Sequence, residues 1–443
     1  MSPPDAPTQH KQATSRACVP RHRSDSLFTM SKTSPVALAR PELTAWRNSL
    51  FVLFALCGIG LASWAARIPT VSASLGLTTG DVGVLLFGIA AGSIGGLLVS
   101  SHLIAAFGTR TVITWALIVG PLGLALAAVG ATVLVSFPVA IAGLAVFGAA
   151  LGACDVSINV SGAANERAIG RNIMPVYHAF FSIGTIAGAL VAALAERLRV
   201  PLEVHIGAIA AVSIIAMLAS VRFLLPEPVS EPEAGTDAAS APGDGWRGRL
   251  SIWRNPRTIF IGLIVLGMAF TEGSANDWLA YAMVEGHGTD KPTGALVFGV
   301  FVTAMTVGRL GGVKLLDRFG RVPVLRVSAV LAAIGLLMLI FVPVVWIAVI
   351  GVVLWGLGAS LGFPVGMSAA ADDPRTAAAS VSAVATIGYV AFLVGPPVIG
   401  FLGEQVGILN GLLLVLVLVA LAGVFSRKAR ELTPLAKRAA QAG

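Results

Sequence analysis

The chain has 443 residues, of which 56% are apolar and only 12% are charged, and its formal net charge is +8. Its three cysteines are odd in number and scattered, which excludes a disulfide framework and a cysteine-ligated metal site. The sequence also lacks a G-x-x-x-x-G-K-[ST] motif, which argues against ATP binding by this chain, and we expect no cofactor.

Twelve apolar runs fill the chain from Asn48 to Ser426. A run of about 18 or more apolar residues can cross a hydrocarbon core of ~30 Å as a helix. Because only a helix satisfies its own backbone polar groups in lipid, the pattern predicts an all-α membrane protein with 12 transmembrane helices. The predicted spans are 48–69, 81–104, 111–131, 134–158, 174–195, 202–224, 257–283, 293–316, 322–342, 344–367, 376–402 and 407–425.

A polar stretch, 226–256, separates the first six spans from the last six and has the Pro, Gly, Ser and acidic content of a flexible linker. The sequence therefore predicts two six-helix bundles, 48–225 and 257–425. Residues 1–47 show no periodicity and no apolar segment of a cleavable signal peptide, so we expect a disordered N-terminal tail. A second tail follows over 426–443.

Lysine and arginine are distributed unevenly between the two sides of the predicted bundles. Of the 30, 25 lie in the tails, the linker and the loops on the same side as the tails, whereas Arg67, Arg197, Arg199 and Lys291 lie on the opposite side and Arg309 lies within a span. Because basic loops stay in the cytoplasm, both termini and the linker are predicted to be cytoplasmic. The basic excess then faces anionic lipid, so it gives no argument for a nucleic-acid partner.

Polar residues within the spans are few, and Asp155 and Asn159 form the first group. A charged residue at the centre of a transmembrane helix costs at least ~2.5–3.5 kcal/mol, so it calls for a function or a partner. The i, i+4 spacing places Asp155 and Asn159 on one helical face. We interpret them as a substrate or proton site that faces a central cavity. The structural alternative is a helix end, with Asp155 paired to a basic loop residue.

The second group is Glu272, Asn276 and Asp277 in the seventh span. If this helix enters the membrane near Arg257, Glu272 lies about 22 Å in, past the midplane. Arg309 in the eighth span needs a counter-charge, and Glu272 and Asp277 are the natural candidates. We predict that Glu272 and Asn276 line the cavity and that Arg309 and Asp277 form a charge pair.

Two aromatic residues complete the predicted site. Trp64 ends the first span and either stacks on a ligand or anchors the helix at the membrane interface. Tyr389 in the eleventh span offers a hydroxyl to a ligand. His178 opens the fifth span, and a hydrogen-bonded packing role is its simpler interpretation, although a histidine can titrate near neutral pH.

The loop between the eighth and ninth spans reads DRFGR over 317–321, and the matching loop of the first half reads AAFGTR over 105–110. An acid followed by two basic residues around a glycine forms a charge cluster at helix ends, and the matching positions indicate an internal repeat. We interpret four of these residues as a gating loop: Asp317, Arg318, Gly320 and Arg321.

With this turn, the twelve spans and the central linker, the chain resembles the major facilitator superfamily over 48–425. The resemblance implies two six-helix bundles related by an axis along the membrane normal, each built from inverted three-helix repeats. It also implies a secondary transporter that works by alternating access. The first-half turn departs from the family pattern at Ala105 and Ala106, and the second-half turn departs at Val313, where the family has a glycine.

Within the superfamily, the segments CDVSINVSGAANERAIGRNIMPVYHAFFSIG, EGSANDW and GYVAFLVGPPVIGFLGE look like an uncharacterised bacterial branch similar to the fucose–galactose–proton symporter family. In those symporters an acid four residues before an asparagine takes part in sugar binding and proton coupling, and Asp155 and Asn159 match that pair. The symporters also carry an acid near the end of the first span, where this chain reads WAAR over 64–67. The resemblance implies a bacterial inner membrane.

The leading hypothesis is a monomeric secondary transporter that moves a small polar solute such as a sugar, with protons as the expected coupling ion. Efflux of amphipathic drugs is the runner-up, favoured by the apolar spans with few charges. A non-transporting membrane sensor on the same fold is a third hypothesis, disfavoured because the tails and linker are short. An enzyme is disfavoured because no span carries a metal-binding or nucleophilic constellation. Apart from the solute and the lipid bilayer, we expect no partner.

Overall fold

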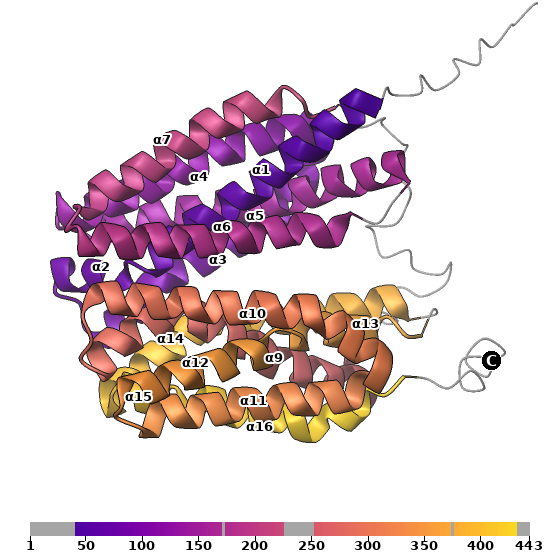
Figure 1. Ribbon diagram of the computed structural model, residues 1–443. Coiled ribbons are helices and arrows are strands. Elements are labelled where there is room, and N and C mark those ends of the chain that lie inside the picture. Colours follow the sequence, from indigo (N-terminus) through magenta and orange to yellow (C-terminus); the bar gives the residue numbers. More distant parts are fainter. Residues whose placement is uncertain (1–39, 171–172, 226–251, 374–375, 432–443) are drawn as a thin grey trace, which may run out of the picture. The chain divides into compact units, whose positions relative to one another are not determined.

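The structure, a computed structural model, describes residues 40–170, 173–225, 252–373 and 376–431. The regular secondary structure of these residues is entirely helical, and 12 of the helical segments are long and apolar enough to cross a membrane (Figure 1). The prediction of an all-α membrane protein with 12 transmembrane helices is therefore confirmed.

The helices fall into two groups, which we call the first half (40–225) and the second half (252–431). The first half contains α1 (Arg40–Ala65), α2 (Ile68–Leu75), α3 (Thr79–Phe107), α4 (Thr109–Thr132), α5 (Phe137–Ile169), α6 (Met174–Arg197) and α7 (Leu202–Val221). The second half contains η1 (Ile252–Arg254), α9 (Pro256–Tyr281), η2 (Ala282–Gly286), α10 (Lys291–Phe319), α11 (Arg321–Phe341), α12 (Val345–Ala359), α13 (Gly362–Ala370), α14 (Ala377–Val406), α15 (Ile408–Gly411), α16 (Leu413–Phe425) and η3 (Ser426–Ala429).

The first helix starts earlier than the predicted span, because α1 begins at Arg40 and not at residue 48. Trp46 explains the difference. Its side chain is 2% exposed, and its indole Nε1 donates to Ser161 Oγ of α5 at 3.0 Å, which holds the additional turns against the bundle. Residues 1–39 of the predicted tail, 226–251 of the predicted linker and 432–443 of the second tail lie outside the described residues. The predicted bundle and tail boundaries stay predictions.

Four predicted spans, the first, seventh, tenth and twelfth, are divided between two helical elements, and the first and tenth are the two with a charged side chain near the break. The first span turns at Arg67 into α2, where a proline in the first turn starts the new helix. The tenth span is interrupted at Ser360 and Leu361, between α12 and α13. The Ser360 carbonyl at this break accepts a hydrogen bond from Arg309 Nε at 3.4 Å, so a charged side chain satisfies a backbone group near the break.

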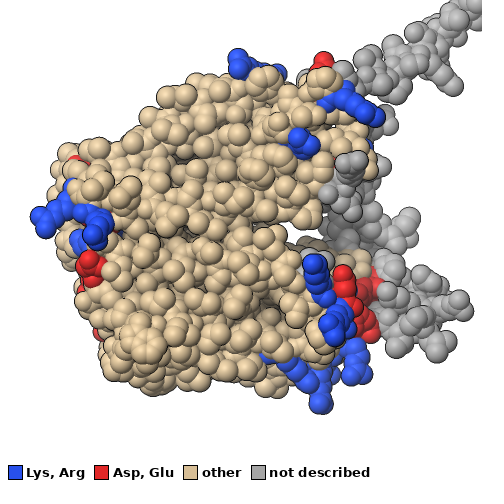
Figure 2. Space-filling view, viewed as in Figure 1, with Lys and Arg blue, Asp and Glu red and all other residues tan. Residues whose placement is uncertain are grey.

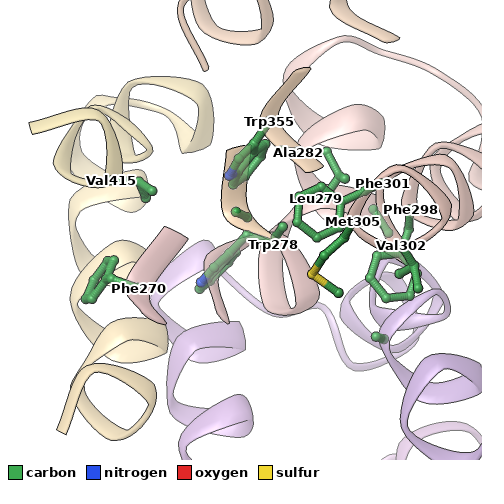
Figure 3. Packing of buried hydrophobic residues seen from close by; sticks show 14 of the residues in the cluster. Phe270, Trp278, Leu279, Ala282, Phe298, Phe301, Val302, Met305, Trp355 and Val415 are labelled. Carbon is green, nitrogen blue, oxygen red and sulfur yellow. The ribbon is translucent and has the colours of Figure 1, made fainter. Parts of the chain in front are cut away.

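One large apolar core joins the two halves. It contains Trp64 and Val82 of the first half together with Trp278 and Tyr281 of the second half, and all four side chains are at most 4% exposed. Figure 3 shows the second-half part of this core, where Trp278 and Trp355 lie among apolar side chains. A separate, smaller core around Trp46 belongs to the first half alone.

The halves contact each other at the helix ends that are farthest from the linker. A Cβ atom on Gly83 of α3 would lie 2.8 Å from the Pro396 carbonyl oxygen of α14, so only a glycine allows this close approach. A Cβ atom on Gly299 of α10 would lie 3.5 Å from Ala189 Cβ of α6. We call this the closed side. On the linker side, Figure 2 shows a hollow between the two halves.

Candidate functional site

Asp155 and Asn159 lie on α5 and contact each other, as their spacing predicts. The Asn159 amide Nδ2 donates to Asp155 Oδ1 at 3.1 Å and to the Asp155 carbonyl oxygen at 2.8 Å. Gly148 and Gly152, which precede Asp155 on the same helix, pack directly on the backbone of α3 and fix the position of α5. Asp155 itself is exposed and Asn159 is half-buried.

Asp155 is approached by side chains from both halves. It lies within electrostatic range of His178 on α6 and of Tyr389 on α14. Both of these side chains are exposed, and the His178 ring makes an edge contact with Phe54 at 5.4 Å between centroids. The expected packing role of His178 is met by its contact with Phe54, and its ring also lies close enough to Asp155 for their charges to interact.

Arg309 on α10 pairs with Glu272 on α9, and the predicted charge pair with Asp277 was wrong. The distance from Arg309 Nη2 to Glu272 Oε1 is 2.7 Å, and the two side chains are 35% and 17% exposed. Asp277 lies five residues further along α9, which is about 7.5 Å along the axis and on a different face of the helix. Arg309 also lies within electrostatic range of His178, so the ion pair belongs to the same neighbourhood as Asp155.

These residues form what we call the central cluster, which draws on α5 and α6 of the first half and on α9, α10 and α14 of the second half. Its members are Asp155, Asn159, His178, Glu272, Arg309 and Tyr389.

The remaining predicted site residues are placed differently. Asn276 and Asp277 are half-buried, about one turn beyond Glu272 on α9. Trp64 is 1% exposed within the core that joins the halves, and its indole Nε1 has no hydrogen-bond partner among the described residues. A ligand cannot reach Trp64 in this conformation.

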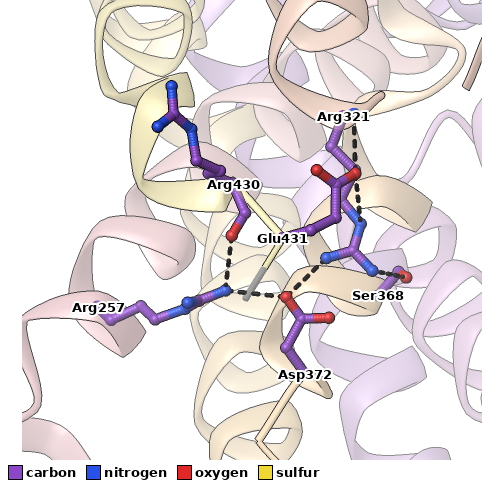
Figure 4. A network of polar contacts seen from close by, with 6 residues as sticks. All are labelled: Arg257, Arg321, Ser368, Asp372, Arg430 and Glu431. Carbon is purple, nitrogen blue, oxygen red and sulfur yellow. Dashed lines mark hydrogen bonds and ion pairs between the residues drawn. The ribbon is translucent and has the colours of Figure 1, made fainter. Parts of the chain in front are cut away.

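The predicted gating loop joins a charge network on the linker side of the second half (Figure 4). Gly320 has a φ of 75°, a left-handed conformation that glycine adopts without strain, and it separates α10 from α11. Arg321 Nη1 donates to Asp372 Oδ2 at 2.7 Å, and Arg257 Nη2 donates to the same oxygen at 2.9 Å. Arg257 also donates to the Arg430 carbonyl oxygen at 3.0 Å. The network therefore ties together the ends of α9, α11, α13 and η3.

The other two loop residues are not central to this network. Asp317 and Arg318 are exposed, and the Arg318 guanidinium lies 5.3 Å from the centre of the Phe319 ring. Asp372 could not be identified from the sequence, because nothing in its local sequence shows that it follows a broken span and faces two arginines. Among the described residues, no group of three or more His, Cys, Asp or Glu side chains is placed to hold a metal ion.

A twelve-helix membrane fold with a polar cluster between two halves is the architecture of a membrane transporter, and comparisons with known proteins agree. A family model, Major Facilitator Superfamily, matches residues 274–442. An uncharacterised MFS-type transporter of Yersinia pestis is 34% identical over 354 residues, which cover 79% of this chain and 87% of the relative. An uncharacterised transporter of Sinorhizobium fredii is 30% identical over a match that covers 82% of this chain and 93% of the relative. The chain belongs to the major facilitator superfamily.

Solved structures share the fold at low sequence identity. The D-xylose–proton symporter has a TM-score of 0.68 and 12% identity, covering 88% of this chain and 99% of its own. The nucleoside transporter NupG has a TM-score of 0.66 and 16% identity, covering 90% and 99%. A variant of the Escherichia coli fucose–proton symporter FucP has a TM-score of 0.58 and 17% identity, covering 87% and 98%.

Proposed function

We propose that this chain is a proton-coupled secondary transporter that binds a small polar solute, such as a sugar, at the central cluster. We place it in a bacterial inner membrane with both termini and the linker in the cytoplasm, because 25 lysines and arginines lie on that side and four on the other. In this orientation the hollow opens to the cytoplasm, and the closed side faces outward.

The observation that carries the proposal is that the central cluster takes polar side chains from both halves, with the Asp155–Asn159 contact on α5 and the Glu272–Arg309 ion pair between α9 and α10. A site built from both halves gains or loses contacts when the halves rock against each other, so binding and conformational change are coupled. The cost of a charge within a transmembrane helix supports the same view, because Asp155 lies within α5 and its side chain is exposed.

The charges of the cluster favour a neutral solute rich in hydroxyl groups. Glu272 and Arg309 neutralise each other, and no arginine in the described part of the chain forms an ion pair with Asp155. An anionic solute would be repelled by Asp155, whereas hydroxyl groups can donate to its carboxylate and to the amide oxygen of Asn159. Three proteins of the same fold, which transport xylose, fucose and nucleosides, support a hydroxyl-bearing solute.

In this mechanism Asp155 carries the coupled proton and Asn159 positions the solute. Asn276 and Trp64 would contact the solute only in another conformation, after the closed side has opened.

The test is solute-induced proton movement in proteoliposomes, with a panel of labelled sugars and nucleosides. Asp155→Asn keeps the size of the side chain but cannot carry the proton. We expect it to abolish accumulation driven by a pH gradient while counterflow exchange of the same solute continues. Glu285→Gln, which removes an exposed acid in η2 directly after α9, is the matched control and should leave accumulation intact. Unchanged proton movement in Asp155→Asn would refute the assigned role.

A further inference from the structure

A groove lies at the linker-side ends of α1, α5 and α6, and its volume is about 780 Å³. Arg40, Arg47 and Phe51 of α1 line one wall, and Ile169 and Val176, at the end of α5 and the start of α6, line the other. No member of the central cluster contributes to the lining. The groove is therefore separate from the site proposed for the solute.

Two arginines line the same wall of the groove. They are seven residues apart, so they project from one face of α1 about 10 Å apart along the axis. Arg47 is half-buried and held in place, because its Nε and Nη2 donate to Asn48 Oδ1 at 3.2 and 3.0 Å and its guanidinium lies 5.6 Å from the centre of the Phe51 ring. These two hydrogen bonds use two of the five N–H donors of the guanidinium. A guanidinium held in place loses little side-chain freedom when it binds a phosphate.

Glu166 of α5 is held by the start of α6. Glu166 lies on α5 close before the lining residues, and its Oε2 accepts the backbone N–H groups of Ile173 and Met174 at 2.6 and 2.7 Å. Its charge is therefore directed at the start of α6.

The rest of the lining is mostly apolar. Leu43, Ile169, Ile173 and Val176 form a surface beside the two arginines. All three helices begin or end here, so the groove lies at the level where a transmembrane helix meets the headgroups. A basic rim next to an apolar wall, at this depth, complements a phosphate group that carries an acyl chain.

The geometry points to a binding site for an anionic phospholipid, with the headgroup phosphate at Arg40 and Arg47 and an acyl chain along Ile169, Ile173 and Val176. A free phosphate would use only the arginines and would leave the apolar wall uncovered. A zwitterionic lipid would use the apolar wall but would carry a cationic group toward the two arginines.

The test is native mass spectrometry of the delipidated full chain in detergent, titrated with phosphatidylglycerol. Phosphatidylcholine with the same acyl chains and glycerol 3-phosphate distinguish a requirement for charge from a requirement for the lipid chain. We expect Arg40→Gln and Arg47→Gln each to weaken phosphatidylglycerol binding about fivefold, and the double variant about 25-fold. Arg110→Gln, an exposed arginine at the start of α4 outside the groove, is the matched control and should bind as the parent does.

A second measurement keeps the proposal testable if a variant fails to fold. In the unmodified chain, raising the salt concentration from about 50 mM to about 500 mM should weaken phosphatidylglycerol binding and leave phosphatidylcholine binding unchanged. Equal binding of the two lipids, parent-like affinity in the double variant, or displacement of the lipid by glycerol 3-phosphate at equal concentration would each overturn the proposal.

Discussion

Glu404, near the end of α14, caps the first turn of α3 across the two halves. Its Oε2 accepts the Gly80 backbone N–H at 3.1 Å and lies 3.4 Å from Thr78 Oγ1. Thr78 Oγ1 has a single proton to donate, and Asp81 Oδ2 lies closer to it, at 3.0 Å. The hydrogen bond from the Gly80 N–H is therefore the stronger of the two contacts that Glu404 makes. Replacing Glu404 by alanine removes this contact and leaves the apolar contacts of the closed side in place.

The expected effect is modest because Glu404 is exposed. A carboxylate at an exposed helix N-terminus contributes about 0.3–1 kcal/mol, and a net hydrogen bond contributes about 1 kcal/mol. Glu404→Ala should therefore weaken closure by about 1–2 kcal/mol, which shifts the conformational equilibrium about 5- to 30-fold toward states with α3 and α14 separated. Glu404→Gln retains an acceptor for Gly80 and should give a smaller shift.

The assay is a distance distribution between spin labels at Ala73 of α2 and Asn410 of α15, which are exposed at the closed side of the first and second halves. The labels require a background in which the native cysteines have been replaced. Glu404→Ala should enlarge the long-distance population, and Glu285→Gln should not. If the distribution in Glu404→Ala is the same as in the parent, the contact does not stabilise closure and the reasoning fails.

Two further predictions concern buried charges. The ion pair of Arg309 and Glu272 is partly exposed, so its coupling free energy should be about 2 kcal/mol, between the values for exposed and buried pairs. A double-mutant cycle with alanine at both positions, read by thermal unfolding in detergent, measures it, and additivity within about 0.5 kcal/mol would contradict the pairing. Asp372 is 8% exposed and accepts from Arg257 and Arg321, so Asp372→Asn should cost about 2–3 kcal/mol of stability in the same assay. A melting temperature equal to that of the parent would show that the network in Figure 4 carries little free energy.

The number of membrane spans could be predicted from the sequence because hydropathy is a local property that each run of residues carries by itself. The contact of Asp155 with Asn159 was equally accessible, because both residues lie on one helix. Contacts between helices were harder to predict. The sequence offered Arg309 two acids on the neighbouring helix, Glu272 and Asp277. Glu272 is the partner because of the rotation of α9 relative to α10, which the sequence does not reveal.

The features that the sequence did not reveal all depend on where a helix starts, breaks or faces. The position of His178 next to Asp155 follows from the packing of α6, whose residues are mostly apolar around the whole helix and so carry no signal for its rotation. The early start of α1 depends on one hydrogen bond from Trp46 to a residue 115 positions away. No periodicity in the tail could indicate that partner.

The apolar core that joins the two halves has a thermodynamic consequence. When the closed side opens, side chains such as Val82 and Trp278 leave that core, whereas the walls that would close on the linker side carry polar groups such as Asp155 and Asn159. The state that is closed on the linker side therefore buries a different apolar area from the state described here. A difference in exposed apolar area between two states gives them different heat capacities. The rate of solute exchange should consequently follow a curved Eyring plot, with an activation enthalpy that depends on temperature.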